Sequence, residues 1–142
     1  MLNNEEINTE EQVVIQENQN EEQLPNQLTD EELRIIEEKV LQLETMFKVK
    51  VHPVVFIHPE TKVRKIGYVQ EPNYATKVAM MDKSMTVGPY AAGDDLRQMC
   101  LLRDHSDPMF YADVSAADEY KMGCAQVCMD LVSMFRNQFK KK

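Results

Sequence analysis

The segment Asp104-His105-Ser106-Asp107 is where residue types suited to catalysis lie closest together in this sequence. It offers acids, a base and a hydroxyl within four residues, and Tyr111 follows shortly after. A nucleophilic triad needs a base held by a third group and an exposed nucleophile, usually drawn from separate segments. Asp and Ser before a proline are also typical of turns. The pattern therefore favours a turn, with a small enzymatic or ligand-binding domain built on this loop as the alternative.

Histidines and cysteines do not form a metal-binding pattern. His52 and His58 share strand parity but lie six residues, or about 20 Å, apart along a strand, too far for one ion. The cysteines are odd in number, and Cys124 and Cys128 are four apart on an expected helix, where a disulfide has poor geometry. We expect exposed strand histidines and buried thiols. The glycines are isolated and form no phosphate-binding loop, so we expect no catalytic residue, metal or cofactor.

Charge is unevenly distributed along the 142 residues, whose formal net charge is −8. Residues 1–28 hold seven glutamates and no Lys or Arg, so the remainder is nearly neutral. A neutral body gives no electrostatic basis for nucleic-acid binding. The first 28 residues are also rich in Asn and Gln and poor in apolar residues, which predicts a disordered acidic tail. Its Val13-Val14-Ile15 cluster is either noise, which we favour, or a small docking motif.

Nothing in the sequence indicates a membrane protein. There is no run of about 18 apolar residues, and the N-terminus lacks the basic and apolar regions of a secretory signal. We therefore expect a cytoplasmic protein.

A helix is predicted to begin at Thr29, because Thr29 and Glu32 form a capping-box pattern. Apolar residues then recur at intervals of three and four, which gives one continuous seam along the helix. This seam consists of Leu33, Ile36, Val40, Leu43 and Phe47. It would be covered either by the core of its own domain or by the equivalent helix of a second protomer.

Period-two patterning over residues 49–70 predicts a β-hairpin with its turn at residues 58–62. Pro53 cannot donate to a ladder, so it indicates an edge position or a bulge. A helix should follow from Pro72 and Asn73, a second at residues 89–102 after Gly88, and a last amphipathic helix near the C-terminus. The expected fold is α+β, with a hairpin packed on a bundle of about four helices in a single domain, residues 29–142.

Methionine is abundant in the helical half of the chain. Met fills irregular cores by default, but it also lines adaptable binding grooves. We therefore expect partner binding at two places, the helical seam and the methionines of the following helix. The candidate partner-binding residues are Leu33, Ile36, Val40, Leu43, Phe47, Met80, Met81 and Met85.

The order of these parts resembles a known family. A hairpin runs into a Pro-led helix through Tyr68-Val69-Gln70-Glu71-Pro72-Asn73-Tyr74, and a later helix ends at Met99-Cys100-Leu101-Leu102. Over residues 49–139 this layout resembles the small tail-assembly chaperones and related virion-assembly proteins of tailed bacteriophages. The resemblance implies a non-enzymatic protein that holds a tape-measure or tail protein until assembly. A homo-oligomer is a further partner prediction for this protein, and a permanent structural virion subunit is the alternative function in the same class.

Overall fold

The computed structural model describes residues 26–132 and 137–139. This part of the chain forms α3 (Asp30–Phe47), β1 (Val51–Ile57), β2 (Arg64–Gln70), α4 (Tyr74–Thr86), α5 (Pro89–Cys100) and α6 (Asp118–Val132). Short 3-10 turns at Arg103–His105, Pro108–Phe110 and Ser115–Ala117 connect α5 to α6. The predicted α+β fold, with one hairpin and four α-helices, is confirmed for the described residues. Residues 1–25 of the predicted tail, and with them Val13-Val14-Ile15, lie outside that part.

The hairpin has the predicted position and turn. β1 and β2 pair antiparallel, from Val51 opposite Gln70 to Ile57 opposite Arg64. The His58 N–H donates to the carbonyl of Val63 at 2.9 Å, which closes the turn. The ring of His58 also accepts the backbone N–H groups of Glu60 and Thr61 through Nδ1.

Pro53 occupies an edge position in the sheet, one of the two alternatives that the sequence left open. It lies opposite Tyr68, whose N–H donates to Ser106 Oγ and whose carbonyl accepts from the Leu102 N–H. The backbone groups of Tyr68 thus point away from β1, and those of Pro53 correspondingly point away from β2. A proline is tolerated there because no ladder hydrogen bond is lost.

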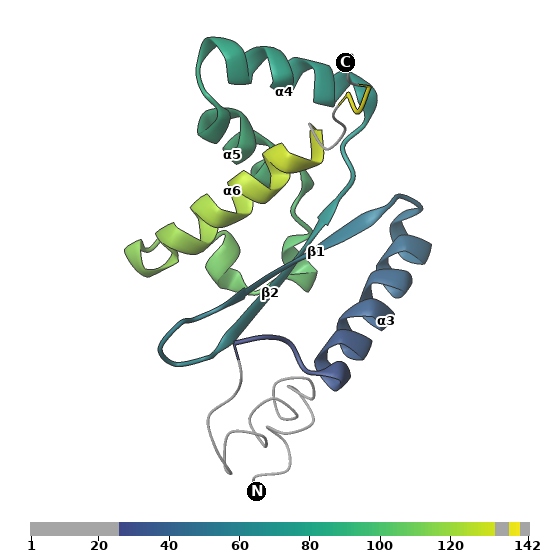
Figure 1. Ribbon diagram of the computed structural model, residues 1–142, viewed down its shortest axis with the longest axis vertical. Helices are drawn as coiled ribbons and strands as arrows, with labels where there is room; N and C mark the ends of the chain where they lie inside the picture. Colours follow the sequence, from purple (N-terminus) through teal and green to yellow (C-terminus); the bar gives the residue numbers. More distant parts are fainter. Residues whose placement is uncertain (1–25, 133–136, 140–142) are drawn as a thin grey trace, which may run out of the picture.

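The hairpin is the central layer of the domain (Figure 1), with α3 on one side and α5 and α6 on the other. Alternation along the strands sends one set of residues to each face. Val51 and Tyr68 join the cluster that contains Ile36 and Leu43 of α3. The opposite set, with Val54 and Val69, joins the larger cluster of the helical half, which contains Ala92, Leu96, Cys100, Leu101, Phe110, Cys124, Cys128 and Met129.

The N-terminal boundary of the domain is defined by contacts just before α3. The predicted capping box is confirmed, since Thr29 Oγ1 accepts from the Glu32 N–H and the Glu32 carboxylate accepts from the Thr29 N–H. Residues 26–28, which composition places in the tail, also touch the domain. Leu28 packs against the α3 cluster, and Asn26 accepts a hydrogen bond from Lys62 in the hairpin turn.

Close helix packing joins α5 to α6. A Cβ atom on Gly93 would lie 2.2 Å from the carbonyl oxygen of Ala125, so only glycine allows the two backbones to approach this far. Phe110 is fully buried and fills the space against Gly67. The helical half is therefore closely packed around α5, α6 and the hairpin.

Candidate protein-binding surface

The Asp104–Asp107 segment is engaged in structural contacts. Ser106 Oγ accepts from the Tyr68 N–H at 3.0 Å and donates to the Leu102 carbonyl at 2.8 Å. The Asp107 carboxylate accepts from the Met109 N–H and lies 3.6 Å from the ammonium of Lys65. These contacts fasten the loop to the outer edge of β2. They are what the turn interpretation of this segment requires.

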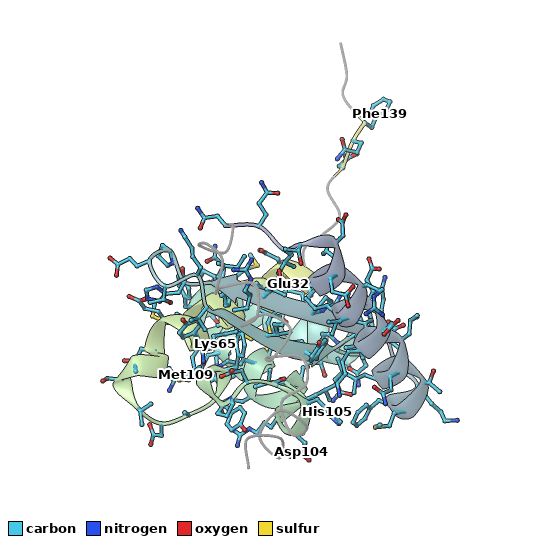
Figure 2. All side chains as sticks on the ribbon, turned by 90° about the horizontal axis from the view of Figure 1, so that it is seen from below. Glu32, Lys65, Asp104, His105, Met109 and Phe139 are labelled. Atoms are coloured by element: carbon cyan, nitrogen blue, oxygen red, sulfur yellow. The ribbon has the colours of Figure 1, made fainter. Side chains whose placement is uncertain are left out.

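His105 and Asp104 lie at the periphery of the domain (Figure 2), and Asp104 is exposed. The His105 ring meets the Phe47 ring edge-on, with centroids 6.0 Å apart, and so braces the C-terminal end of α3. Tyr111 is covered by the guanidinium of Arg103 at 5.1 Å. The segment therefore contributes packing and turn chemistry to the fold.

The two strand histidines are half-buried rather than exposed as predicted. His58 accepts backbone N–H groups within the hairpin turn, and His52 pairs with Glu71 through Nε2. Each ring is therefore held against the domain by a hydrogen bond to a nearby group, which explains its partial burial. Within residues 26–132 and 137–139, no group of three or more His, Cys, Asp or Glu side chains is arranged to hold a metal ion.

The cysteines are buried free thiols, as predicted. Cys124 and Cys128, one turn apart on α6, are hydrogen-bonded to each other, which lowers the pKa of the Cys124 thiol and raises that of Cys128. Burial raises the pKa of the Cys100 thiol, and the negative charge of Glu71 adds to the effect. Thiols in this setting behave as small apolar side chains.

The apolar seam of α3 is largely used inside the domain, which corrects the prediction that it binds a partner. Ile36 and Leu43 are 4% and 0% exposed, because the hairpin covers them. Val40 is half-buried in the same cluster. Leu33 and Phe47, at the two ends of the seam, keep exposed side chains. Of the two coverings that the periodicity left open, the structure shows the domain's own core.

Helix α4 forms where its sequence predicts. Asn73 is its N-cap, and Asn73 Oδ1 accepts from the Thr76 N–H at 2.8 Å. The interior is rich in Ala, Lys and Met, which are good helix formers. Gly88, with φ at +149°, ends the segment and turns the chain into α5 at Pro89.

Helix α4 is held to the domain by two ion pairs and a few apolar contacts. Lys77 pairs with Glu71, which also contacts His52 of β1, and Lys83 pairs with Asp95 of α5. Met80 packs against the core cluster of the helical half, so this methionine, predicted to bind a partner, faces inward. No residue of α4 is fully buried. The helix therefore lies on the outside of the domain, at the end opposite the hairpin turn (Figure 1).

The outer face of α4 is apolar. An exposed stripe follows i, i+4, i+7 and i+11 spacing, which places its members on one face of the helix. Tyr74 and Met85 are each 82% exposed, and Val78 and Met81 are 43% and 38% exposed. Only one of the eight exposed residues of α4 is charged; the eight are Tyr74, Ala75, Val78, Ala79, Met81, Asp82, Met85 and Thr86. Water-facing helices normally carry many more charges.

We name Tyr74, Val78, Met81 and Met85 the α4 stripe. Only two of these four residues are among the predicted partner-binding residues. Met81 and Met85 are where partner binding was expected. Tyr74 and Val78 were not included, although the helical spacing that joins them to Met81 is visible in the sequence. That spacing alone is equally compatible with a stripe that faces the core. The rotation of the helix about its own axis decides whether the stripe faces the core or the solvent.

A second exposed feature lies where α3 passes into β1. Residues 45–50 are all exposed, and a broad, shallow depression of about 520 Å³ is lined by Glu44, Lys48, Val49 and Lys50. Glu44 is already engaged there, because its carboxylate accepts the Val51 N–H at 3.0 Å. The depression is open, and three of its four lining residues are charged.

The fold and this surface define a class: a small α+β domain with a central two-stranded hairpin and one solvent-facing apolar helix. Comparison with known proteins gives no match to a family model, to a curated protein or to a solved structure. The resemblance to phage tail-assembly proteins therefore stays a prediction. Among the described residues, none of the helices has both the length and the apolar character needed to cross a bilayer.

Proposed function

We propose that this chain is a non-enzymatic protein-binding module that docks a partner protein on the α4 stripe. The observation that carries the proposal is the exposure of Tyr74, Val78, Met81 and Met85 on a helix with no fully buried residue. Contiguous exposed apolar patches on a small protein are typically interaction sites. Their exposure has a free-energy cost that only a covering partner removes.

The chemistry of the described surface supports binding through shape and apolar contact. The two lysines of α4 are half-buried and paired within the domain, Lys77 with Glu71 and Lys83 with Asp95. Met side chains are flexible and polarizable, so they adapt to partners of different shape. The contacts of Ser106 and Asp107 support the same class of function, because they explain those residues without catalysis.

The narrower form of the proposal is an assembly factor like the phage tail-assembly chaperones, holding a tape-measure or tail protein. Its support is the layout of hairpin, Pro72-led helix and later helices, together with the acidic N-terminal sequence. Seven glutamates would help to keep a complex with an aggregation-prone client in solution. The host cytoplasm is the compartment that this role implies.

A comparison of three tagged proteins, each co-expressed with the genes that flank its own, tests the proposal. The wild type is compared with Met85→Glu and with a matched control, Met122→Glu, since Met122 is an exposed methionine on α6. We expect one larger protein to co-purify with the wild type and with Met122→Glu, and to be lost from Met85→Glu. Mass spectrometry then identifies the partner and tests the phage assignment separately.

Two results would contradict the proposal. One is equal recovery of the partner with Met85→Glu, which would place binding elsewhere. The other is the absence of any stoichiometric partner from the wild type under these conditions.

A further inference from the structure

We infer that, in the absence of a client, the α4 stripe is covered by a second copy of this chain, with the two α4 helices antiparallel. The inference rests on the proposed function, because it assumes that the stripe is a protein-binding surface. It goes further by naming the partner, the orientation and the residue pairs.

The stripe is symmetric about its own midpoint, which favours an identical partner. A reversed copy centred between Ala79 and Met80 places Tyr74 at the height of Met85 of the second copy, and Val78 at the height of Met81. The exposed fractions of the four side chains are also nearly symmetric about this midpoint: 82%, 43%, 38% and 82% along the helix. The most prominent side chains therefore meet each other at both ends, and the recessed ones meet in the middle. A two-fold axis gives each contact twice.

The pairing at the two ends is chemically favourable. A thioether against an aromatic ring is a stabilising contact, and Tyr74 with Met85 provides it at both ends of the interface. In the middle, Val78 and Met81 are apolar and of moderate size. Nothing in this arrangement buries a polar side chain of the stripe other than the Tyr74 hydroxyl, which can remain at the rim.

Charges beside the stripe do not oppose the pairing. In an antiparallel helix pair each flank meets the same flank of its partner. Asp82 then lies beside Ala75 and Ala79 of the second copy, which are small and neutral. The two Asp82 residues differ in height by five residues, or about 7.5 Å, and stay at the solvated edge. On the other flank, the ion pair with Glu71 holds the Lys77 ammonium against its own domain and away from the second copy.

The position of α4 also keeps the first described residues of the two copies apart. The described chain begins beside the hairpin turn, where Asn26 contacts Lys62. Helix α4 is attached at the other end of the hairpin, through Glu71 and Lys77. Each strand of the hairpin is seven residues long, about 23 Å, so the first described residues of the two copies lie at the far ends of the dimer. Pairing through α4 therefore leaves the N-terminal ends of the described chains far from the contact.

The size of the contact predicts a reversible dimer. Pairing would bury roughly 1,000 Å² of solvent-accessible surface on the stripe and its flanking alanines, summed over both copies. A standard protein–protein interface buries about 1,600 Å². An apolar contact of this size is compatible with a dissociation constant on the order of 10 μM. The dimer should therefore dissociate on dilution and give way to a client that offers a larger surface.

Sedimentation velocity of the full chain across a concentration series tests the association. We expect a monomer–dimer equilibrium for the wild type and for Met122→Glu. Met85→Glu should raise the dissociation constant at least ~30-fold, because the symmetric contact buries the new carboxylate twice. Circular dichroism melting of each variant shows that the monomer fold is intact, as expected for changes at exposed positions.

Cysteine cross-linking tests the orientation. A Tyr74→Cys protein mixed with a Met85→Cys protein should form a mixed disulfide under mild oxidation. Tyr74→Cys alone should not cross-link, because the two copies of that position lie about 16 Å apart along the antiparallel pair, beyond disulfide reach. Efficient cross-linking of Tyr74→Cys with itself would indicate a parallel pair and overturn the inference.

The same proteins separate this inference from the proposed function. A wild-type chain that is monomeric at every concentration, yet loses its client through Met85→Glu, overturns the dimer and leaves the binding function standing. A dimer that persists in Met85→Glu also overturns the inference, because another surface then holds the copies together. A dimer that is lost in Met85→Glu while no client is found supports the inference alone.

Discussion

The Arg64 guanidinium and the Glu32 carboxylate form an ion pair that is almost completely buried between β2 and α3. The side chains are 0% and 2% exposed, and Arg64 Nε lies 2.9 Å from Glu32 Oε2. The remaining guanidinium nitrogens donate to the backbone carbonyls of Lys62 and Gln27, at 2.7 and 2.9 Å. Glu32 also completes the capping box of α3. One pair thus joins the hairpin, the start of α3 and the first described residues.

Replacing Glu32 should destabilise the fold strongly. Glu32→Gln leaves the Arg64 charge buried without its counterion, and breaking one partner of a buried pair costs about 3 kcal/mol. Urea denaturation monitored by circular dichroism measures the loss. The control is Glu38→Gln, which removes an exposed partner of Arg34 and should leave the midpoint unchanged. Equal midpoints for the two variants would show that the pair does not hold α3 to the hairpin.

Gly93 should tolerate no side chain. Gly93→Ala places Cβ 2.2 Å from the Ala125 carbonyl oxygen, a backbone atom that can move only if α5 and α6 separate, so we expect a loss of about 3 kcal/mol. Gly123→Ala is the comparison, because its Cβ would meet the ring tip of Phe56, a side chain, at 2.8 Å. Improved helix propensity offsets part of that strain, so its net effect should stay within about 1 kcal/mol. Similar thermal melting of both variants would contradict this packing argument.

Local rules account for much of this fold. The capping box at Thr29, the hairpin turn and the edge position of Pro53 each depend on residues close in sequence, and each is confirmed. The α3 seam is different, because periodicity shows that Ile36 and Leu43 need a cover without showing which one. That cover is the hairpin face carrying Val51 and Tyr68.

The candidate surface was harder to predict for the same reason. Tyr74, Val78 and Met81 have the spacing of a core helix, and Met80, next in sequence to Met81, does face the core. The side of α4 that faces the domain carries Lys77 and Lys83, which pair with Glu71 and Asp95. The Asp95 partner is distant in sequence, and the Glu71 carboxylate precedes the helix. Nothing local in the sequence marks either as an anchor.

Acid should loosen α4 through Glu71. Burial raises the pKa of the Glu71 carboxyl, but hydrogen bonds from Lys77 and His52 outweigh it and bring the pKa below the ordinary 4.5. A carboxyl with a lowered folded-state pKa stabilises the fold fully above its unfolded value, and that stability is lost as pH falls through the folded value. The stability difference between wild type and Glu71→Gln should therefore be constant near neutral pH and shrink below pH 4.5.

Urea midpoints of both proteins, measured from pH 7 down to pH 3, give this difference. Taking the difference matters because the pKa of Asp94 also lies below its ordinary value, where hydrogen bonds from Arg97 and Gln98 outweigh burial. That contribution is common to both proteins and cancels. A difference that grew as the pH fell would mean that Glu71 has the opposite linkage and that its pairing with Lys77 does not stabilise the fold.

The thiols should be unreactive in the native protein. Cys100, Cys124 and Cys128 are 5%, 0% and 1% exposed, and burial raises the pKa of Cys100. The lowered pKa of Cys124 comes from its hydrogen bond with Cys128, and that bond exists only while the thiols are buried together. We therefore expect negligible reaction with a thiol-specific disulfide reagent at pH 8, and reaction of all three cysteines in guanidinium chloride.

An exposed thiol introduced on α5, the helix of Cys100, calibrates the measured reaction rates. Met99 lies beside Cys100 on α5 and is 50% exposed, so Met99→Cys should add one rapidly reacting thiol to the native count. Slow reaction of the three native cysteines beside a fast Met99→Cys signal would show that α5 and α6 stay closed around them. If Cys124 instead reacted as fast as the introduced thiol, the core cluster around it, which includes Leu96 of α5, would have to open readily.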